Sequence, residues 1–437
     1  MSKATNARAA ALEALTRCRR DGAWSGDVLD SILKRAELDR RDAALASRLC
    51  LGVLQNDRLC DFYIDSFCHT KLEPPVRDIL RLGVYQLLFL DRVPARAAVS
   101  ETVELCRQKG YARASGLVNA VLRRVADAES LPEIPGEGTT AYLATRWSHP
   151  EWLCETLTNE KGYAFAEAFL KKNNEPPRLL IQVNTLKVST ADYIRALQRA
   201  EIPFEAMEPE GCIALEGGLA TALPGFEEGL FYVQDRAARL AVEIAAPEPG
   251  MRVLDACACP GGKSFAAAIR MENSGSILSC DIHEKKLRLL NSGAERLGID
   301  IIETRPMDAR VFDAALEKSF DLVIADVPCS GLGVIAKKPE IRTKKPEELQ
   351  GLPAIQGAIL DNLSRCVKPG GTLLYSTCTI LKEENEAVVL RFLREHTDYR
   401  AEAFTCCGIE SDSGMYTFWP QIDDTDGFFA ARLTRTF

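Results

Sequence analysis

The first third of the chain has the hydrophobic pattern of helices. In "SGDVLDSILKRAEL", the apolar positions 28, 29, 32 and 33 lie on one helical face. "PPVRDILRLGVYQLLFLDRV" places Pro75 in a first helical turn and carries a wide apolar stripe. The same period continues in "RAAVSETVELCRQKG" and "ASGLVNAVLRRVADA". We therefore predict an all-α domain over residues 1–130 and a linker over residues 131–140, where "LPEIPGEGTT" breaks the period.

The pattern of the next segment, residues 141–235, mixes helix and strand signals. "PRLLIQVNTLK" alternates between apolar and polar positions as a strand does, and "GLFYVQD" reads as a second strand. Between them, "TADYIRALQRAEI" has helical spacing. This segment is therefore predicted to be a small α+β subdomain.

The remaining chain, residues 236–437, alternates between short apolar runs and helix-like segments. The candidate strands are "RVLDAC", "GSILSCD", "IIETRP", "FDLVIADVP" and "GGTLLYST". Such alternation predicts a doubly wound α/β domain with a parallel sheet, and sheets of this kind bind ligands at the carboxyl ends of their strands. The fold class is therefore multidomain, with all-α, α+β and Rossmann-like α/β parts.

Composition places the chain among soluble proteins of several domains. It has 437 residues, of which 46% are hydrophobic and 27% charged, and it has no apolar run of the ~18 residues that a membrane span needs. The start, "MSKATNARAAALEALTRCRR", carries Glu13 within its apolar part, which indicates an amphipathic helix and not a signal peptide. We expect a cytoplasmic monomer with no membrane partner.

The net charge of −8 argues against nucleic-acid binding by the whole surface. Residues 1–135 hold 21 Lys and Arg against 18 Asp and Glu, a net of +3, so the remaining residues carry −11. Any contact with a nucleic acid must therefore come from local basic patches.

Cysteine is abundant, with 15 residues, but its spacing does not suggest a metal site. There is no C-x-x-C pair, and the chain has only four histidines. Disulfides are not expected in a cytoplasmic chain. We expect most of these thiols to be small core residues and predict no metal cofactor.

A glycine turn follows the first strand of the α/β domain, in "LDACACPGGKSFAAAI". Backbone N–H groups at such a turn can approach a ligand closely. A dinucleotide fingerprint is absent, and a phosphate-binding P-loop would need glycine at Cys257, although Gly262, Lys263 and Ser264 match the second half of that motif. The third interpretation is an S-adenosylmethionine pocket.

Acidic residues at the ends of successive strands favour the S-adenosylmethionine pocket. Asp281 stands 19 residues after Gly262, close to the ~20 expected for an acid that binds ribose hydroxyls. Asp308 follows the third strand, where it is placed to reach the adenine, and Asp326 ends the fourth strand. One such acid could be a helix N-cap, but a run of three favours a shared pocket.

The motifs of the α/β domain together resemble the RNA cytosine-C5 methyltransferase family. They are "DACACPGGK", "DVPCSG", "VKPGGTLLYSTCTI" with the following "EENE", and the late "DGFF". The helical part, with "LRLGVYQLLFLDRVPARAAVSETVELC" and "LVNAVLRR", resembles a NusB-type RNA-binding domain. The fusion, with "VNTLK" and "VQD" between, is similar to the members of that family that act on small-subunit ribosomal RNA.

The resemblance implies an enzyme that methylates C5 of cytosine 967 in 16S ribosomal RNA, free or in a pre-30S particle, with S-adenosylmethionine as cofactor. It makes Cys378 the nucleophile, Cys329 the residue that assists release of the product, and Asp326 a contact of the cofactor or the cytosine ring. The implied cofactor-binding residues are Cys257, Ala258, Cys259, Pro260, Gly261, Gly262, Lys263, Asp281, Asp308 and Asp326.

Cytosine chemistry gives a reason for a thiol at the mouth of a strand. C5 of cytosine is too weak a nucleophile to take a methyl group directly. A thiolate that adds to C6 makes C5 reactive, and a base must later remove the C5 proton so that the thiol can leave. A buried, inert cysteine remains the alternative for each of the two positions.

A basic loop follows Cys329. "AKKPEIRTKKP" carries Lys337, Lys338 and Arg342 as candidate RNA contacts, although a solvated loop would have the same composition. The chain departs from the family pattern at Cys259, Arg236, the lysine pair 337–338 and Gln421. Three rival functions remain: methylation of another RNA (transfer RNA or large-subunit ribosomal RNA), a non-catalytic NusB-like RNA-binding factor, and a P-loop ATPase.

Overall fold

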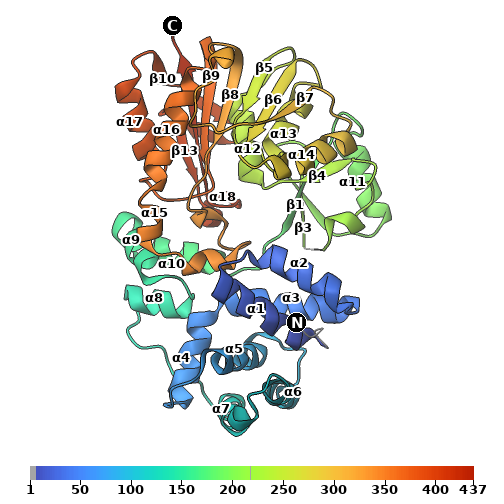
Figure 1. Ribbon diagram of the computed structural model, residues 1–437, viewed down its shortest axis with the longest axis vertical. Coiled ribbons are helices and arrows are strands. Elements are labelled where there is room, and N and C mark those ends of the chain that lie inside the picture. The colour runs from blue at the N-terminus through green and yellow to red at the C-terminus, as the bar shows by residue number, and fades with distance from the viewer. Residues whose placement is uncertain (1–5, 217) are drawn as a thin grey trace. The chain divides into compact units, whose positions relative to one another are not determined.

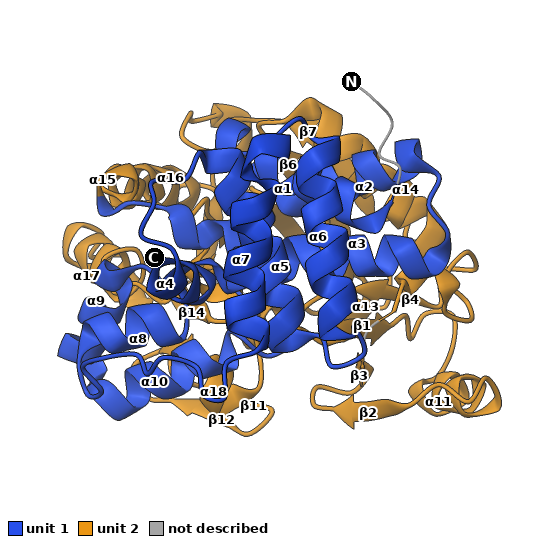
Figure 2. Ribbon diagram, turned by 90° about the horizontal axis from the view of Figure 1, so that it is seen from below, with its two compact units in different colours: residues 1–175, 335–346 blue, residues 176–334, 347–437 orange. Residues whose placement is uncertain are grey.

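The chain forms two compact units in the computed structural model, which describes residues 6–216 and 218–437. The first unit contains residues 1–175 and 335–346, and the second contains residues 176–334 and 347–437 (Figure 2). The first unit thus takes in a short segment that lies far along the chain, between two strands of the second unit.

The first unit is all-helical, and it contains the helices that were predicted within residues 1–130. The apolar stripes of the sequence become the buried faces of its long helices, with Leu15, Ile32, Leu49 and Ile64 fully enclosed. Its helices are α1 (Ala7–Asp21), α2 (Ser25–Ala36), α3 (Arg40–Gln55), α4 (Asp57–Phe67), α5 (Pro74–Phe89), α6 (Ala95–Gln108), η1 (Ala112–Ala114), α7 (Ser115–Ala126), α8 (Thr140–Arg146), α9 (Glu151–Lys161), α10 (Tyr163–Lys172) and η5 (Pro339–Thr343).

The second unit begins with a small antiparallel sheet that matches the predicted α+β subdomain. Its strand order is β2–β3–β1–β4, and Ile181 of β1 pairs with Ile213 of β3 on one side and Val233 of β4 on the other. The fully buried Tyr193 packs against it. The elements are β1 (Leu179–Val183), α11 (Thr190–Arg199), β2 (Phe204–Met207), β3 (Cys212–Leu215), η2 (Ala220–Ala222) and β4 (Phe231–Val233).

A larger sheet follows, and its strand order confirms the predicted doubly wound domain. The order is β10–β14–β9–β8–β5–β6–β7, with β13 paired to β14. The five predicted strands, β5 to β9, run parallel, and β14 adds antiparallel to β9. The chain reverses its direction of winding between β5 and β8, so the strand ends at this point form the natural ligand crevice.

The elements of this domain are α12 (Arg236–Ala245), β5 (Arg252–Asp255), α13 (Gly262–Arg270), β6 (Ser276–Asp281), α14 (Glu284–Leu297), β7 (Ile302–Pro306), η3 (Ala314–Leu316), β8 (Phe320–Asp326), η4 (Leu332–Val334), α15 (Pro346–Leu349), α16 (Leu352–Ser364), β9 (Val367–Thr377), α17 (Glu386–Glu395), β10 (Tyr399–Ala401), β11 (Phe404–Cys406), β12 (Ile409–Ser411), β13 (Met415–Phe418), α18 (Pro420–Asp423) and β14 (Phe428–Arg435).

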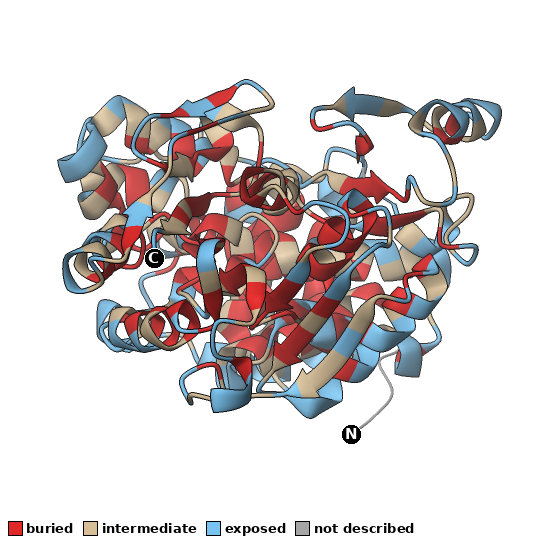
Figure 3. Cartoon of the chain, turned by 90° about the horizontal axis from the view of Figure 1, so that it is seen from above, coloured by how far each residue is buried: buried red, intermediate tan, exposed pale blue. Residues whose placement is uncertain are grey.

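Helices cover both faces of the large sheet (Figure 1). Val253 and Ile324 face the core formed with α12, α13 and α14, whereas Leu254 and Val323 face the core formed with α16 and α17. Because neighbouring residues of a strand point to opposite faces, a strand covered on both sides must be apolar throughout. The central strands are accordingly buried along most of their length (Figure 3).

Candidate functional site

The predicted glycine turn closes tightly between β5 and α13. Gly261 has φ +115°, a conformation that residues with a side chain rarely adopt. A Cβ there would lie 2.6 Å from the ring of Phe265 and 2.9 Å from Leu290. Glycine at 261 therefore lets the turn fold back against α13 and α14, which leaves the start of α13 open toward the strand ends.

A cavity of about 190 Å³ lies in front of this turn. It is bounded by the end of β4, the start of α12, the turn itself and the end of β8. Its lining residues are Val233, Gln234, Ala238, Asp255, Cys257, Ala258, Cys259, Pro260, Gly262, Lys263 and Asp326. Most of the predicted cofactor-binding residues thus meet around one cavity, and Gly261, Asp281 and Asp308 are not among its lining.

An ion pair crosses the base of the cavity. Lys263 Nζ lies 2.7 Å from Asp326 Oδ2, and Ser376 Oγ donates to Asp326 Oδ1 at 2.8 Å. Burial by itself would lower the pKa of Lys263, but the charge and hydrogen bond of Asp326, together with the nearby Asp255 and Cys378, outweigh it, and the pKa is raised. Lys263 is therefore a fixed ammonium group that holds the carboxylate of Asp326 at the strand end.

Asp255 is a site residue that sequence reasoning missed. It ends β5, lines the cavity, is 0% exposed, and accepts a hydrogen bond from Ser264 Oγ at 2.7 Å. Burial raises its pKa to about 7, against the opposing hydrogen bond from Ser264. The signal was present in "RVLDAC", since Asp255 ends a strand just as Asp281 and Asp326 do.

Three further lining residues, Val233, Gln234 and Ala238, were also missed because they come from outside the α/β motifs. Gln234 Oε1 accepts from Tyr232 Oη at 3.2 Å, but its buried Nε2 has no partner among the described residues. A Cβ at Gly262 would lie 3.2 Å from that Nε2. An unsatisfied donor beside open space fits a polar ligand in this cavity.

The other two predicted acids are held within their own turns. Asp281 Oδ1 accepts the backbone N–H of His283 at 2.8 Å, and the Cys259 thiol hydrogen-bonds to the same carboxylate. Burial and the charge of Asp281 raise the pKa of Cys259 to about 12. Asp308 pairs with Arg310 at 2.6 Å, and the hydrogen bonds from Arg310 lower the pKa of Asp308 to about 2.

The two predicted thiols lie next to each other. Cys329 Sγ and Cys378 Sγ are 3.2 Å apart, and both residues are partly exposed. They meet because β8 and β9 are parallel neighbours in which Asp326 is level with Ser376, so the turns that follow these strands lie side by side. The hydrogen bond with Cys378, followed by burial, raises the pKa of Cys329 well above its usual value. This raised pKa favours the protonated thiol at Cys329.

The remaining thiols match the predicted role of core residues at several positions. Cys280 and Cys366 are buried, and all fifteen cysteines are free.

Within residues 6–216 and 218–437, no helix is both long enough and apolar enough to cross a membrane.

The predicted RNA-binding loop divides into exposed and buried parts. Lys338 is exposed and its Nζ lies 4.9 Å from the centre of the Trp24 ring, while Lys337 is half-buried. Arg342, in contrast, is only 6% exposed. Both Trp24 and this loop belong to the helical unit.

The surroundings of Arg342 correct its interpretation as an RNA contact. Its guanidinium donates to the carbonyls of Gln55, Trp147, Ser148 and Asn173 at 2.7 to 3.2 Å. It also donates to Asn174 Oδ1 at 2.7 Å. Arg342 thus satisfies helix ends and turns inside the helical unit, and it is not available to a phosphate.

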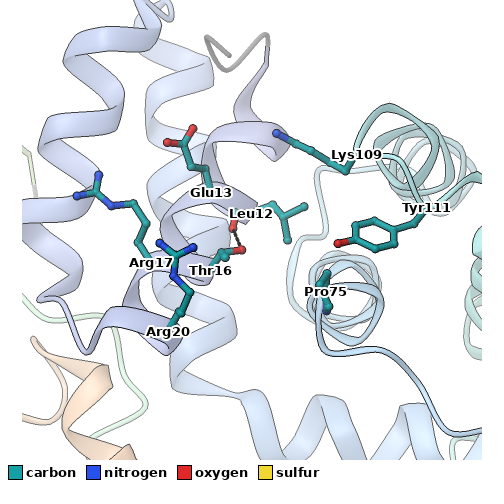
Figure 4. Close-up of a pocket in the computed structure, with 8 residues that line it drawn as sticks. All are labelled: Leu12, Glu13, Thr16, Arg17, Arg20, Pro75, Lys109 and Tyr111. Carbon is teal, nitrogen blue, oxygen red and sulfur yellow. Dashed lines mark hydrogen bonds between the residues drawn. The ribbon is translucent and has the colours of Figure 1, made fainter. Parts of the chain in front are cut away.

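The helical unit holds a second cavity, of about 300 Å³, beside α1. Arg17 and Arg20 come from α1, and Lys109 and Tyr111 face them from the turn after α6 (Figure 4). The other lining residues are Leu12, Glu13, Thr16 and Pro75. Within the described part of the chain, the side chains of Arg17 and Lys109 form no ion pair. The lining thus combines three basic side chains, one acidic side chain and one aromatic ring.

Strand order, glycine turn and strand-end acids together define a methyltransferase with a Rossmann-like sheet. Comparison with known sequences agrees. A family profile described as 16S rRNA methyltransferase RsmB/F matches residues 242–434. Profiles of the NusB family and of the RsmF/B-like ferredoxin-like domain match residues 5–127 and 149–221.

Full-length relatives define the family. A probable ribosomal RNA small subunit methyltransferase B from Bacillus subtilis is 35% identical, over 99% of this chain and 99% of the relative. One from Erwinia tasmaniensis is 31% identical over 100% of both. The chain belongs to the ribosomal RNA small subunit methyltransferase B family.

Solved structures agree with this placement. A protein named PH0851 has a TM-score of 0.82 and 26% identity, over 98% of both chains. A methyltransferase homologue from Pyrococcus horikoshii has a TM-score of 0.59 and 26% identity, over 67% of this chain and 97% of the homologue.

Proposed function

We propose that this protein transfers a methyl group to C5 of a cytosine in small-subunit ribosomal RNA, at cytosine 967 of 16S rRNA. The observation that carries the proposal is the pair of thiols, Cys329 and Cys378, with Sγ atoms 3.2 Å apart. They follow the same two strands whose ends hold Asp326 and Ser376, beside the cofactor cavity. A methyltransferase that must add to cytosine C6 needs a thiol at this place.

The cavity at the glycine turn would hold S-adenosylmethionine, which supplies the methyl group when bound. The unsatisfied Gln234 Nε2 offers a donor to its polar groups. Asp281 would accept from the ribose hydroxyls, and Asp308 would reach the adenine after its pair with Arg310 opens. The remaining contacts would come from the turn, residues 257–263.

Cys378 would act as the nucleophile. Its Sγ adds to C6 of the cytosine, and the electron pair of the C5–C6 double bond moves toward C5, which becomes the attacking atom. Asp326, fixed by Lys263 and Ser376, would contact the cytosine ring or the cofactor, and the ammonium group of Lys263 would offset the negative charge that the ring gains as the thiolate adds. After C5 has taken the methyl group, a base removes the C5 proton, and the C5–H electron pair restores the C5–C6 double bond as the C6–S bond breaks. Cys378 leaves as a thiolate, to which Cys329 can return a proton.

The target base must leave its stack to reach Cys378, so the RNA is single-stranded or unpaired at this cytosine. The second cavity, beside α1, and the exposed Lys338 would bind other phosphates and bases of the RNA.

The proposal also includes the domain boundaries 1–130, 141–235 and 236–437, a cytoplasmic location and a monomeric state.

A direct experiment joins two measurements. Bisulfite sequencing of ribosomal RNA compares a strain that lacks the gene with the same strain carrying the wild-type chain. The purified protein is then incubated with S-adenosylmethionine and an RNA in which the target is 5-fluorocytosine. We expect one methylated cytosine in the small-subunit RNA to return with the gene, and an RNase-sensitive, slowly migrating protein band in the denaturing gel.

The result also separates the rival functions. Methylation restored in transfer RNA or large-subunit RNA would redirect the proposal to that substrate. A protein that binds RNA but neither S-adenosylmethionine nor the modified RNA covalently would be a non-catalytic binding factor.

A further inference from the structure

A buried carboxylate stands beside the two thiols and has no part in the chemistry proposed above. Glu384 belongs to the "EENE" segment and is only 1% exposed. Its Oε2 accepts the backbone N–H of Ser330 at 2.9 Å and the side-chain amide of Gln356 at 2.8 Å. Gln356 also donates to the carbonyl of Pro328 at 3.0 Å. The carboxylate is thus tied to residues on both sides of Cys329.

The same carboxylate reaches the turn of the other thiol. Glu384 Oε1 faces Thr379 Oγ1 at 3.5 Å, and Thr379 Oγ1 lies 2.7 Å from Ser330 Oγ. Ser330 and Thr379 are both 0% exposed, and each directly follows one of the two cysteines. The contacts of Glu384 therefore join the two cysteine-bearing turns.

Asn385, the next residue, fixes the Cys378 turn from within. Its Oδ1 accepts from Thr377 Oγ1 at 2.6 Å, and its Nδ2 donates to the carbonyl of Thr379 at 3.0 Å. The residues before and after Cys378 are thereby immobilised, whereas the thiol itself stays partly exposed. Backbone contacts join the two turns as well, since the N–H of Gly333 donates to the carbonyl of Cys378 at 3.0 Å. The link through Glu384, Ser330 and Thr379 adds a connection between the side chains of the two turns.

We propose that Glu384 is a positioning residue that sets the separation and orientation of the Cys329 and Cys378 thiols. A buried carboxylate that accepts several hydrogen bonds is stiff, since losing any one leaves a buried polar group unsatisfied. Small displacements of reacting groups are costly in catalysis. The catalytic consequence rests on the proposed function, but the effect on thiol geometry does not.

The main test replaces Glu384 with an isostere. In Glu384→Gln, an amide oxygen in the place of Oε2 can keep the two N–H contacts, but the NH2 group in the place of Oε1 can no longer accept from Thr379 Oγ1. The charge is lost, and the hydrogen bonds of the Thr379 and Ser330 hydroxyls must reverse their direction. We expect adduct formation with 5-fluorocytosine RNA to slow about ten- to a hundredfold, with unchanged affinity for S-adenosylmethionine. The matched control is Glu383→Gln, at an exposed neighbouring carboxylate, which should behave as wild type.

A milder pair of variants guards against a folding defect. Thr379→Val removes the hydroxyl that meets Ser330 but keeps the shape, and Thr379→Ser keeps the hydroxyl. We expect Thr379→Val to slow adduct formation and Thr379→Ser to restore it. Equal rates for both variants would contradict a role for this link.

The rate of disulfide formation reports the separation and orientation of the two thiols without RNA. Diamide joins two close thiols: the Sγ–Sγ bond forms, both S–H bonds break, and the two hydrogens reduce the N=N bond of diamide to a hydrazine. Peptide mass spectrometry follows the Cys329–Cys378 disulfide, with the pair Cys406 and Cys407, whose Sγ atoms are 3.7 Å apart, as internal reference. We expect Glu384→Gln to slow the first disulfide relative to the second.

The two readouts separate the two proposals. Wild-type rates of both disulfide and adduct formation in Glu384→Gln would overturn the positioning role. If the wild-type chain forms no RNA adduct while Glu384→Gln still slows the disulfide, the positioning role stands and the proposed function fails.

Discussion

The cofactor cavity of the α/β unit and the basic cavity of the helical unit are both lined by charged groups, but they hold those groups differently. In the cofactor cavity, Lys263 and Asp326 are paired at 2.7 Å. Ser376 donates a hydrogen bond to Asp326, and Ser264 donates one to Asp255. Arg20 of the helical cavity is exposed and pairs with the adjacent Asp21. Charges fixed at strand ends suit chemistry, which needs preorganised groups, whereas exposed charges on helices suit adaptable binding to a polyanion.

The largest expected effects come from the two thiols. Cys378→Ala should lower methylation at least about a thousandfold and abolish the covalent RNA band, because no group remains to add to C6. Cys329→Ala should still form the bond to C6 but release it slowly, so that the linked complex accumulates. Denaturing gels of both variants with unmodified RNA measure this contrast. The opposite assignment would exchange the two gels.

The buried Arg342 shows that the helical unit also has a fixed charge, with a structural role. Arg342→Met should destabilise that unit by about 3 kcal/mol, since several buried carbonyls lose their donor. Changing Lys337 and Lys338 to Gln should leave the unfolding free energy within about 0.5 kcal/mol and weaken RNA binding. Chemical denaturation and filter binding measure the two effects. Stability loss in the lysine variant would place those lysines in the fold.

Asp255 tests how strongly the cofactor cavity controls ionisation. Its folded pKa of about 7 is above the ordinary aspartate value, so the folded state binds an extra proton between about pH 4 and pH 7. Stability from this group is therefore complete below about pH 4 and is lost as the pH rises through 7. Wild type should lose about 2–4 kcal/mol relative to Asp255→Asn between pH 5 and pH 8. Parallel pH dependences of urea unfolding in both proteins would contradict this.

Asp281→Ala should weaken S-adenosylmethionine binding about tenfold to a hundredfold, which corresponds to roughly 1.5–3 kcal/mol for lost charge-assisted hydrogen bonds. Calorimetry on the purified variant measures the affinity. Asp308→Ala is the informative companion, since Asp308 is already paired with Arg310 and should have a smaller effect. An unchanged affinity in Asp281→Ala would remove this residue from the cofactor site.

The smallest effect is expected in the basic cavity. Changing Arg17 and Lys109 together to Gln should weaken RNA binding severalfold and reduce the salt slope by about one unit per lost phosphate contact. Lys71 and Arg123, also changed to Gln, give a control of equal charge at exposed positions of the same unit. Binding over a range of salt concentrations measures both. An equal loss of RNA affinity in the control variant would show that the effect comes from the lower net charge and not from the cavity.

Periodicity and strand-end motifs were enough to predict the parts of this protein that depend on local order. The apolar stripes predicted the helical domain, and the alternation after residue 236 predicted strands β5 to β9. The motif residues from Cys257 to Lys263, apart from Gly261, meet at one cavity, and Cys329 meets Cys378. These predictions share one physical basis. Parallel strands bring their carboxyl ends to one edge of the sheet, so residues that directly follow such strands lie near one another at that edge.

Long-range packing decided the rest. By composition Arg342 resembles the lysines of its loop, but its two terminal guanidinium nitrogens are buried and donate to backbone carbonyls and to Asn174 Oδ1. Gln234 joins the cavity from the end of the small sheet, and Glu384 joins the two thiol turns from a segment with no chemistry of its own. The sequence by itself determined which elements form and which strand ends carry reactive groups, because hydrophobic period and turn residues act locally. Only the tertiary structure decided which charges are buried and which polar groups meet, because burial and hydrogen-bond partners depend on residues far apart in the chain.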